Sequence, residues 1–305
     1  MDLTFDHVTK LYGPVIGVND VSCRIGPGIT GLLGANGAGK STLIKLASGQ
    51  LRPSQGSVRV GQHSAWSTAA KRNFGYSPDL DRFYEEMDGR EFVYTMARLY
   101  GYRRREARER TELALEEVGM TERAGRRLGG CSHGMRQRIK LAQALVHDPD
   151  LLLLDEPLNG IDPGGRREIN ELLLRLAERG KAVLVSTHIL VDVESLADTI
   201  VMISRGRIIA AGTLAEVRNL LDDQPLVIEI ASDRTRELAS LLAASVEVRS
   251  VELQGDKLTV KTTQPTKFFA SVAQLVAEHK FALERMQTLD SGAEAVFVYL
   301  ERGAS

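Results

Sequence analysis

Apolar and polar residues follow one another along the chain in patterns that predict a mixed α/β protein. Residues 2–9 alternate between apolar and polar side chains, which is typical of a half-buried strand, and Val18–Ile25 and Ile29–Leu33 predict two more strands. Leu151–Leu154 is a continuous apolar run, as expected for a strand buried on both faces of a parallel sheet. Ala182–Ser186 predicts the next buried strand. We therefore expect an α/β core that contains a parallel sheet.

The middle of the chain has a different pattern. Strand-forming residues become rare from about residue 88 to residue 124, and Glu91–Gly101 and Arg103–Val118 carry apolar residues at helical spacing. These segments predict a helical subdomain, at about residues 80–148, inserted into the α/β core. The run Arg103–Arg110 contains glutamates at helical spacing and no nearby aromatic residues, so a solvated helix face is favoured over a nucleic-acid or lipid surface.

The pattern changes again near residues 222–225. Residues 226–285 predict strand, helix, strand, strand, helix and strand in that order, which is typical of a small split-βαβ domain. Leu289–Leu300 fits a closing amphipathic helix. We expect one domain at residues 1–220 and an accessory α+β domain at residues 225–305, which carries no catalytic or metal-binding pattern and is interpreted as a docking or regulatory module.

Composition narrows the class of protein. The chain has 305 residues, 26% of them charged and 43% hydrophobic, which is ordinary for a soluble globular protein. The net charge of −1 gives no general attraction to nucleic acid or anionic membrane. The first six residues do not resemble a signal peptide, and no apolar run approaches the roughly 20 residues that a membrane span needs. Two cysteines, Cys23 and Cys131, predict no disulfide framework, so we expect a cytosolic, reduced protein.

The segment Gly34–Thr42 matches the phosphate-binding pattern G-x-x-x-x-G-K-[ST] and lies between a predicted strand and a predicted helix. Its glycines let backbone N–H groups approach phosphate oxygens, and the helix N-terminus adds partial positive charge. Lys40 is expected to contact the β- and γ-phosphates, and Ser41 to contact Mg²⁺. The predicted nucleotide-binding residues of this loop are Gly34, Asn36, Gly37, Ala38, Gly39, Lys40, Ser41 and Thr42.

Two acidic residues, Asp155 and Glu156, end the buried run Leu151–Leu154. Asp155 is expected to hold Mg²⁺, directly or through water. Glu156 is expected to orient and polarise the water that attacks the γ-phosphate. Together with the phosphate-binding loop, these residues predict an ATPase rather than a protein that only binds nucleotide.

The segment Cys131–Arg138 suggests a second anion site, because Ser132 is placed to cap the helix that follows. This segment resembles the signature of the ATP-binding subunits of ABC transporters, which usually reads Leu-Ser-Gly-Gly-Gln followed by x-Gln-Arg. The chain keeps Ser132, Gly134 and the pair Gln137-Arg138, and it departs at Cys131, His133 and Met135. The resemblance covers residues 1 to about 215, and it implies that Ser132 and Gly134 contact ATP held by a second subunit.

The resemblance implies roles for further residues. Tyr12 would stack on adenine and Val18 would line the base, Leu158–Asp162 would be the loop that links the two sites of a dimer, and His188 would contact the γ-phosphate. Asp79 stands where the family has a glutamine that ligates Mg²⁺. A carboxylate can also ligate Mg²⁺, but it adds negative charge beside the triphosphate.

We therefore expect a P-loop ATPase of the ABC type with an inserted helical subdomain and a small α+β domain after it. Its substrate and cofactor would be ATP and Mg²⁺, and its partners a second ATPase subunit, commonly an identical copy, and a separate membrane permease on the inner face of the cell membrane. No nucleic-acid partner is expected. A soluble ABC ATPase acting on ribosomes or DNA is the alternative. It is disfavoured because the chain has one phosphate loop and no sustained heptads. A nucleotide-binding regulator without hydrolysis is disfavoured because Glu156 and His188 are both present.

Overall fold

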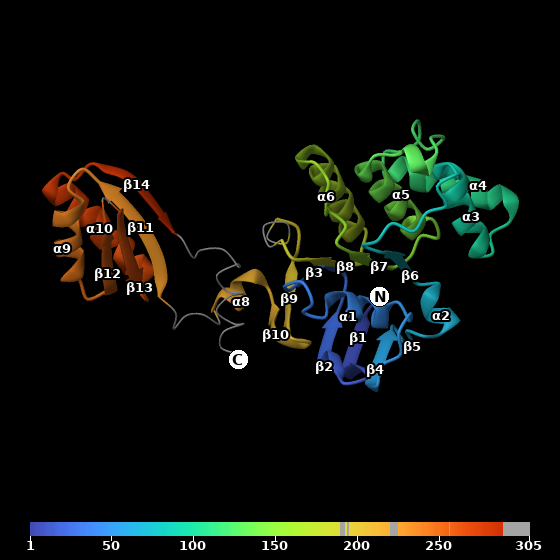
Figure 1. The fold of residues 1–305 in the computed structure, drawn as a ribbon, viewed down its shortest axis with the longest axis horizontal. Helices are drawn as coiled ribbons and strands as arrows, with labels where there is room; N and C mark the ends of the chain where they lie inside the picture. Colours follow the sequence, from blue (N-terminus) through green and yellow to red (C-terminus); the bar gives the residue numbers. More distant parts are fainter. Residues whose placement is uncertain (190–192, 194, 220–224, 256, 289–305) are drawn as a thin grey trace. The chain divides into compact units, whose positions relative to one another are not determined.

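The computed structural model describes residues 1–189, 193, 195–219, 225–255 and 257–288 (Figure 1). The chain divides into two compact units, Met1–Thr213 and Leu214–Ser305, and each is described by itself.

A six-stranded sheet forms the centre of the first unit, with the strand order β10-β9-β3-β8-β7-β6. Its strands are β3 (Gly28–Leu33), β6 (Phe74–Ser77), β7 (Leu151–Asp155), β8 (Ala182–Thr187), β9 (Thr199–Ser204) and β10 (Arg207–Gly212). The strands from β9 to β6 are parallel, and β10 adds an antiparallel edge. Because β3, β8, β7 and β6 run the same way, the loops that follow them emerge at one edge of the sheet.

The four leucines of β7 show why this strand is apolar throughout. Leu152 and Leu154 belong to the cluster that includes the helical subdomain, whereas Leu151 and Leu153 belong to the cluster on the other face of the sheet. Alternate side chains therefore enter two different cores, and every residue of β7 is buried. The predicted parallel, doubly covered strand is confirmed.

A second, antiparallel sheet lies beyond the first helix, with the order β2-β1-β4-β5. It consists of β1 (Leu3–Tyr12), β2 (Val15–Ile25), β4 (Gln55–Val60) and β5 (His63–Ser64), and α2 (Thr68–Lys71) follows it. Helix α1 (Lys40–Ala47) contacts both β7 of the central sheet and β4 of this one. Its buried face, with Leu43, Ile44 and Leu46, fills the core between the two sheets.

The helical subdomain is inserted between β6 and β7, as expected. It contains α3 (Gly89–Leu99), α4 (Arg104–Glu117), the short 3₁₀ helix Leu128–Gly130 and α5 (His133–Leu145), and it shares a core cluster with α6 (Pro163–Glu178) (Figure 1). The charged run in α4 forms i,i+4 ion pairs, Arg105 with Glu109 at 2.9 Å and Arg110 with Glu106 at 3.1 Å. The solvated helix face predicted for this run is confirmed.

The second unit contains α8 (Leu214–Asn219), β11 (Leu226–Ser232), α9 (Thr235–Ala243), β12 (Val248–Gln254), β13 (Lys257–Thr262), α10 (Pro265–His279) and β14 (Leu283–Thr288). Its sheet is antiparallel, with the order β12-β13-β11-β14. Ile228, Ile230 and Val260 pack on one face of the sheet in the same cluster as Leu238 and Phe268 of the helices. The predicted βαββαβ order is present from β11 to β14. The amphipathic helix predicted at residues 289–300 lies outside the described residues.

His147 joins the helical subdomain to the central sheet. It follows α5, its Nε2–H donates to the carbonyl of Phe74 at the start of β6 (3.0 Å), and its ring stacks on Tyr100 at 3.8 Å. Among the described residues, Nδ1 has no hydrogen-bond partner. Burial lowers the pKa of His147 to about 4, so the folded protein keeps this ring neutral near neutral pH.

His147 is expected to make the stability of the fold sensitive to acid. The unfolded chain protonates His147 near pH 6.5 and the folded chain only near pH 4, so its contribution to stability is complete above pH 6.5 and falls as the pH approaches 4. The charges of Asp148, Lys181 and Arg110 act less strongly on the ring than burial does. A His147→Phe variant keeps an aromatic ring and cannot titrate. Between pH 7 and pH 4 we expect the parent to lose up to about 3 kcal/mol more unfolding free energy than this variant. Urea unfolding followed by the fluorescence of Trp66 measures the difference, and equal losses would contradict the assignment.

Candidate functional site

The loop Gly34–Thr42 connects the end of β3 to the start of α1, at the edge where the parallel strands end. Gly37 and Gly39 have φ angles of 83° and 113°, which side chains strongly disfavour. A Cβ atom at Gly34 would lie 2.5 Å from the carbonyl oxygen of Ile203, and one at Gly39 would lie 2.7 Å from that of Gly17. These glycines allow the loop to fold closely against the sheet while Asn36 and Gly37 remain exposed.

Lys40 is buried at the N-terminus of α1 and has several acceptors around its ammonium group. Nζ donates to the carbonyl oxygens of Gly34 (2.7 Å) and Ala35 (3.3 Å) and lies 3.5 Å from Oε1 of Glu156. A triphosphate would supply stronger acceptors at the same place, because phosphate oxygens carry full negative charge. The loop therefore fits a phosphate group, and the ammonium group of Lys40 lies at the place where that group would bind.

Ser41, Asp155 and Ser186 meet where α1, β7 and β8 converge. Oγ of Ser41 and Oγ of Ser186 both donate to Oδ1 of Asp155, at 3.4 and 2.6 Å. Asp155 is buried, and these two hydrogen bonds fix the direction of its carboxylate. Within the described part of the chain, no three His, Cys, Asp or Glu residues are grouped as a metal site. Mg²⁺ suits such a place, because it commonly takes one or two protein oxygens together with water and substrate phosphates.

Glu156 follows Asp155 in a strained backbone conformation. Its φ is 49°, and its N–H lies within hydrogen-bond distance of Oγ (3.0 Å) and of the carbonyl (3.2 Å) of Ser186. The carboxylate of Glu156 contacts Lys40 on one side and Nδ1 of His188 on the other, where both oxygens are 3.1 Å from the ring nitrogen. A strained residue held by two neighbouring elements is typical of a functional site. The structure thus places Lys40, Glu156 and His188 in one chain of contacts.

Tyr12 and Val18 occupy different environments. Tyr12 is partly exposed beside the loop: its hydroxyl is 3.5 Å from Oγ1 of Thr42, and its ring lies against Gly17, where a Cβ atom would be 2.6 Å from Cε2. Val18 is fully buried in the core cluster, next to Gly39. In this structure Tyr12 offers an aromatic surface at the loop, whereas Val18 supports the loop from below and offers no surface to a base.

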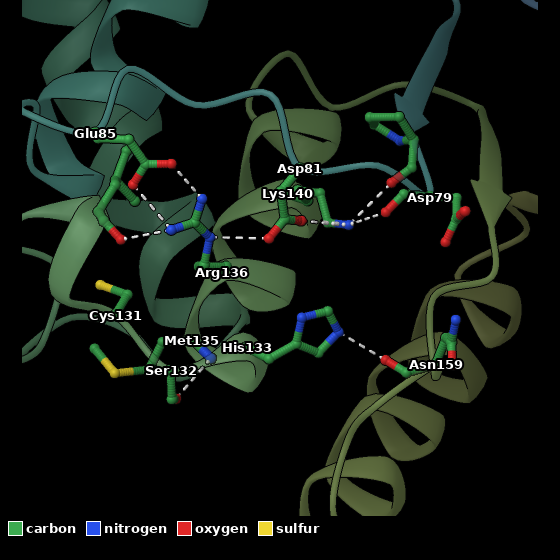
Figure 2. A network of polar contacts seen from close by, with 12 residues as sticks. Asp79, Asp81, Glu85, Cys131, Ser132, His133, Met135, Arg136, Lys140 and Asn159 are labelled. Atoms are coloured by element: carbon green, nitrogen blue, oxygen red, sulfur yellow. Dashed lines mark hydrogen bonds and ion pairs between the residues drawn. The ribbon is translucent and has the colours of Figure 1, made fainter.

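Ser132 and Gly134 lie at the start of α5, in the helical subdomain. Oγ of Ser132 accepts the N–H of Met135 at 3.3 Å, so the expected N-cap is confirmed (Figure 2). Among the described residues, neither Ser132 nor Gly134 has a hydrogen bond to the loop Gly34–Thr42. Both instead line a groove of about 540 Å³ together with Arg123 and the start of α6. A side chain at Gly134 would meet open space.

Asp79 follows β6, a short strand that the pattern of apolar and polar residues does not predict. Ser77 pairs with Leu154 in the parallel sheet, so Asp79 and Asp155 emerge at the same sheet edge. Burial raises the pKa of Tyr76, and the negative charges of Asp155 and Asp79 raise it as well. Asp79 itself is exposed.

Two groups of residues at the site were not assigned from the sequence. Ser186 orients Asp155 and Glu156, and its signal was a hydroxyl residue ending a buried strand beside β7. Arg136 and Lys140 hold the segment after β6, and their signal was two cations at i,i+4 spacing on a helix with an apolar face.

His133 contacts the carbonyl of Asn159 with Nε2 at 2.8 Å, so α5 also reaches the loop after Glu156 (Figure 2).

Known proteins share this arrangement of sequence and fold. Residues 18–159 match the ABC transporter family. The linearmycin resistance ATP-binding protein LnrL of Bacillus subtilis (strain 168) is 31% identical over 98% of this chain and 97% of its own length. The Nod factor export ATP-binding protein I of Rhizobium sp. (strain N33) is 36% identical over 85% of both chains. The dimeric structure of a bacterial ABC transporter cassette has a TM-score of 0.63 and 25% identity, covering 70% of this chain and 98% of the other.

These similarities and the residues of the site both indicate an ATPase. The helices of the described residues include none that is long and apolar enough to span a membrane. The match to the ABC transporter ATPase domain includes the phosphate loop, Asp155 at the end of β7 and Glu156 after it. The full-length similarity to an ATP-binding protein extends through the second unit. This chain is an ATPase, and it belongs to the ATP-binding proteins of the ABC transporter family.

Proposed function

We propose that this protein powers export through a separate integral membrane permease, and that two ATPase subunits bind two ATP molecules between them. The observation that carries the proposal is the separation of the two halves of the site. The phosphate loop has its own catalytic carboxylate, whereas Ser132 and Gly134 line a groove apart from it. The helix N-terminus behind Ser132 favours an anion, and a second subunit would bring one to it.

Each residue at the phosphate loop has a proposed part in hydrolysis. The N–H groups of Gly37, Gly39 and Lys40 bind the phosphates, and the Lys40 charge balances their negative charge. Ser41 and Asp155 would hold Mg²⁺, with Asp79 as a third oxygen donor. The bound ion would neutralise charge on the transferring phosphoryl group.

The acid and the histidine beside the loop have distinct proposed roles. Glu156 accepts a proton from the attacking water, because its carboxylate lies beside Lys40, the residue proposed to bind the γ-phosphate. His188 donates a hydrogen bond to the γ-phosphate and keeps Glu156 oriented, as its 3.1 Å contact with that carboxylate suggests. Tyr12 stacks on adenine at the outer side of the loop. The base-lining role expected for Val18 would require a change in its buried position.

The proposals of export and of a membrane location are based on the names of the related proteins. The Rhizobium relative is named for export of Nod factor and the Bacillus relative for linearmycin resistance. We propose that residues 1–220 form the ATPase domain, that residues 225–305 form an accessory domain, and that the protein lies in the cytoplasm on the inner face of the cell membrane.

Co-purification from the source cell tests this function. The tagged full chain should be recovered with the membrane fraction and bring down an integral membrane protein, and release of that partner should leave ATPase activity in the soluble chain. The alternative, a soluble ABC ATPase that acts on ribosomes or DNA, predicts recovery in ribosomal or nucleic-acid fractions. Recovery only in those fractions would contradict the export proposal.

A further inference from the structure

Helix α5 holds a segment that has no secondary structure of its own. Residues 78–87 are all described, and none lies in a helix or strand. This segment carries Asp79 out of β6 and leads into the helical subdomain. Its far end receives main-chain hydrogen bonds, from Leu128 to the carbonyl of Met87 and from Gly129 to that of Glu85, whereas the end that carries Asp79 is held by side-chain contacts.

Lys140 supplies the contacts nearest Asp79. Its side chain is 2% exposed, and Nζ donates to the carbonyl oxygens of Pro78 (3.0 Å) and Asp79 (2.8 Å) while forming an ion pair with Oδ1 of Asp81 at 2.9 Å (Figure 2). A buried ammonium group is costly unless all three donors find acceptors. Here two main-chain carbonyls accept hydrogen bonds from Nζ and the Asp81 carboxylate supplies the opposite charge, and all three groups belong to the segment that carries Asp79.

Arg136 extends the same attachment by one helical turn. Its Nε donates to Oδ2 of Asp81 at 2.9 Å, its other nitrogens contact Glu85 at 2.9 and 2.6 Å, and Nη1 donates to the carbonyl of Leu128 at 3.0 Å (Figure 2). Asp81 thus bridges the two cations of α5. Burial alone would raise the pKa of Asp81, but Lys140 and Arg136 outweigh it and hold that pKa below its usual value. The two cations and the two carboxylates balance in charge.

The same helix carries the signature at its other end. Ser132 caps α5, and Lys140 follows two turns later, so one rigid element joins the signature to the backbone of Asp79. Through His133, α5 also contacts Asn159, in the loop after Glu156. A displacement of α5 would therefore be transmitted to the segments that follow both β6 and β7.

We propose that Lys140 is a positioning residue for ATP hydrolysis, which fixes the main chain of Pro78 and Asp79 to the signature helix so that the two move as one body. This inference rests on the proposed site. Lys140 makes no contact with Gly34–Thr42 among the described residues, so its loss leaves the phosphate loop intact. The prediction is a fall in kcat without a matching rise in KM, because misalignment of a bound substrate slows the chemical step rather than binding.

Lys140→Met is the variant that tests this, since methionine has a similar length and no charge. We expect kcat for ATP to fall about 10- to 100-fold with KM changed less than about threefold. Amide hydrogen exchange should rise in residues 79–87 of the full chain. Leu115→Ala is the matched control: it removes buried side-chain volume in α4 of the same subdomain and lowers stability, while the groups that Lys140 contacts, Pro78, Asp79 and Asp81, all remain. It should leave kcat within about twofold of the parent.

The pair Lys140→Met and Asp81→Asn then forms a double-mutant cycle. If Lys140 acts through this attachment, the double variant should be little slower than Lys140→Met, because the two changes break the same contact. An unchanged kcat in Lys140→Met, or an equal fall in Leu115→Ala at equal melting temperature, would overturn the inference. The site itself is checked separately by ATP binding to the parent: failure of the parent to bind ATP would contradict the proposed site, whatever Lys140 does.

Discussion

Replacing Glu156 with glutamine is expected to reduce ATP turnover about 10²- to 10⁴-fold, while ATP binding is retained. Glutamine has the shape of glutamate but cannot accept a proton from water. The backbone should tolerate the change, because Ser186 holds the N–H of residue 156 and the side chain is not involved. The change removes the ion pair between Glu156 and Lys40 at 3.5 Å, but it removes no positive charge that attracts the triphosphate. Binding of ATP should therefore not be weakened. Single-turnover hydrolysis and equilibrium binding of ATP measure the two effects.

A trapped dimer is the second expected property of Glu156→Gln. If hydrolysis reopens the pair of subunits, the variant should accumulate as an ATP-bound dimer during size-exclusion chromatography. Glu109→Gln is the matched control, since Glu109 pairs with Arg105 on the exposed face of α4. The control should turn over ATP at the parent rate. Parental turnover in Glu156→Gln would show that another group activates the water.

Replacing Lys40 with alanine is expected to weaken ATP binding about 10- to 100-fold and to remove hydrolysis at ordinary ATP concentrations. The ammonium group is buried among loop carbonyls and the Glu156 carboxylate, so it places a full positive charge at the phosphate-binding loop. Without it, Glu156 would repel the triphosphate. Isothermal titration with ATP measures the loss. Lys45→Ala, an exposed lysine on the same helix, should bind as the parent does. Equal affinity in Lys40→Ala would contradict the assigned phosphate contact.

The sequence predicted those parts of the site whose chemistry is local. The phosphate loop needs glycines at fixed spacing between a strand and a helix, and the structure places Gly34, Gly37 and Gly39 there for the steric reasons that the motif implies. The leucine run of β7 was recognisable because burial on both faces removes polar residues from the strand. The cap at Ser132 was recognisable because it requires one hydroxyl at one position.

Long-range contacts were not predictable in the same way. Strand β6 has four residues and includes a glycine, so it carries too little pattern to be identified alone, yet it sets the position of Asp79. The hydrogen bonds of Lys140 reach Asp79 and Pro78, which lie 61 and 62 positions before it in the sequence. No local pattern encodes such a pairing. Val18 was expected at the base because of its place in the family order, but its side chain points into the core beside Gly39.

The central claim is that one active site is built from two subunits, and cross-linking tests it most directly. Two variants are prepared in a Glu156→Gln, Cys23→Ser, Cys131→Ser background, which removes both natural cysteines. One carries Asn36→Cys on the exposed phosphate loop, and the other carries Gly134→Cys, where a side chain meets open space. The two chains are mixed and treated with a short bismaleimide, with and without ATP. We predict a product of twice the chain mass that requires both variants and ATP. Absence of that product with ATP, or an equal yield without ATP, would contradict the composite site.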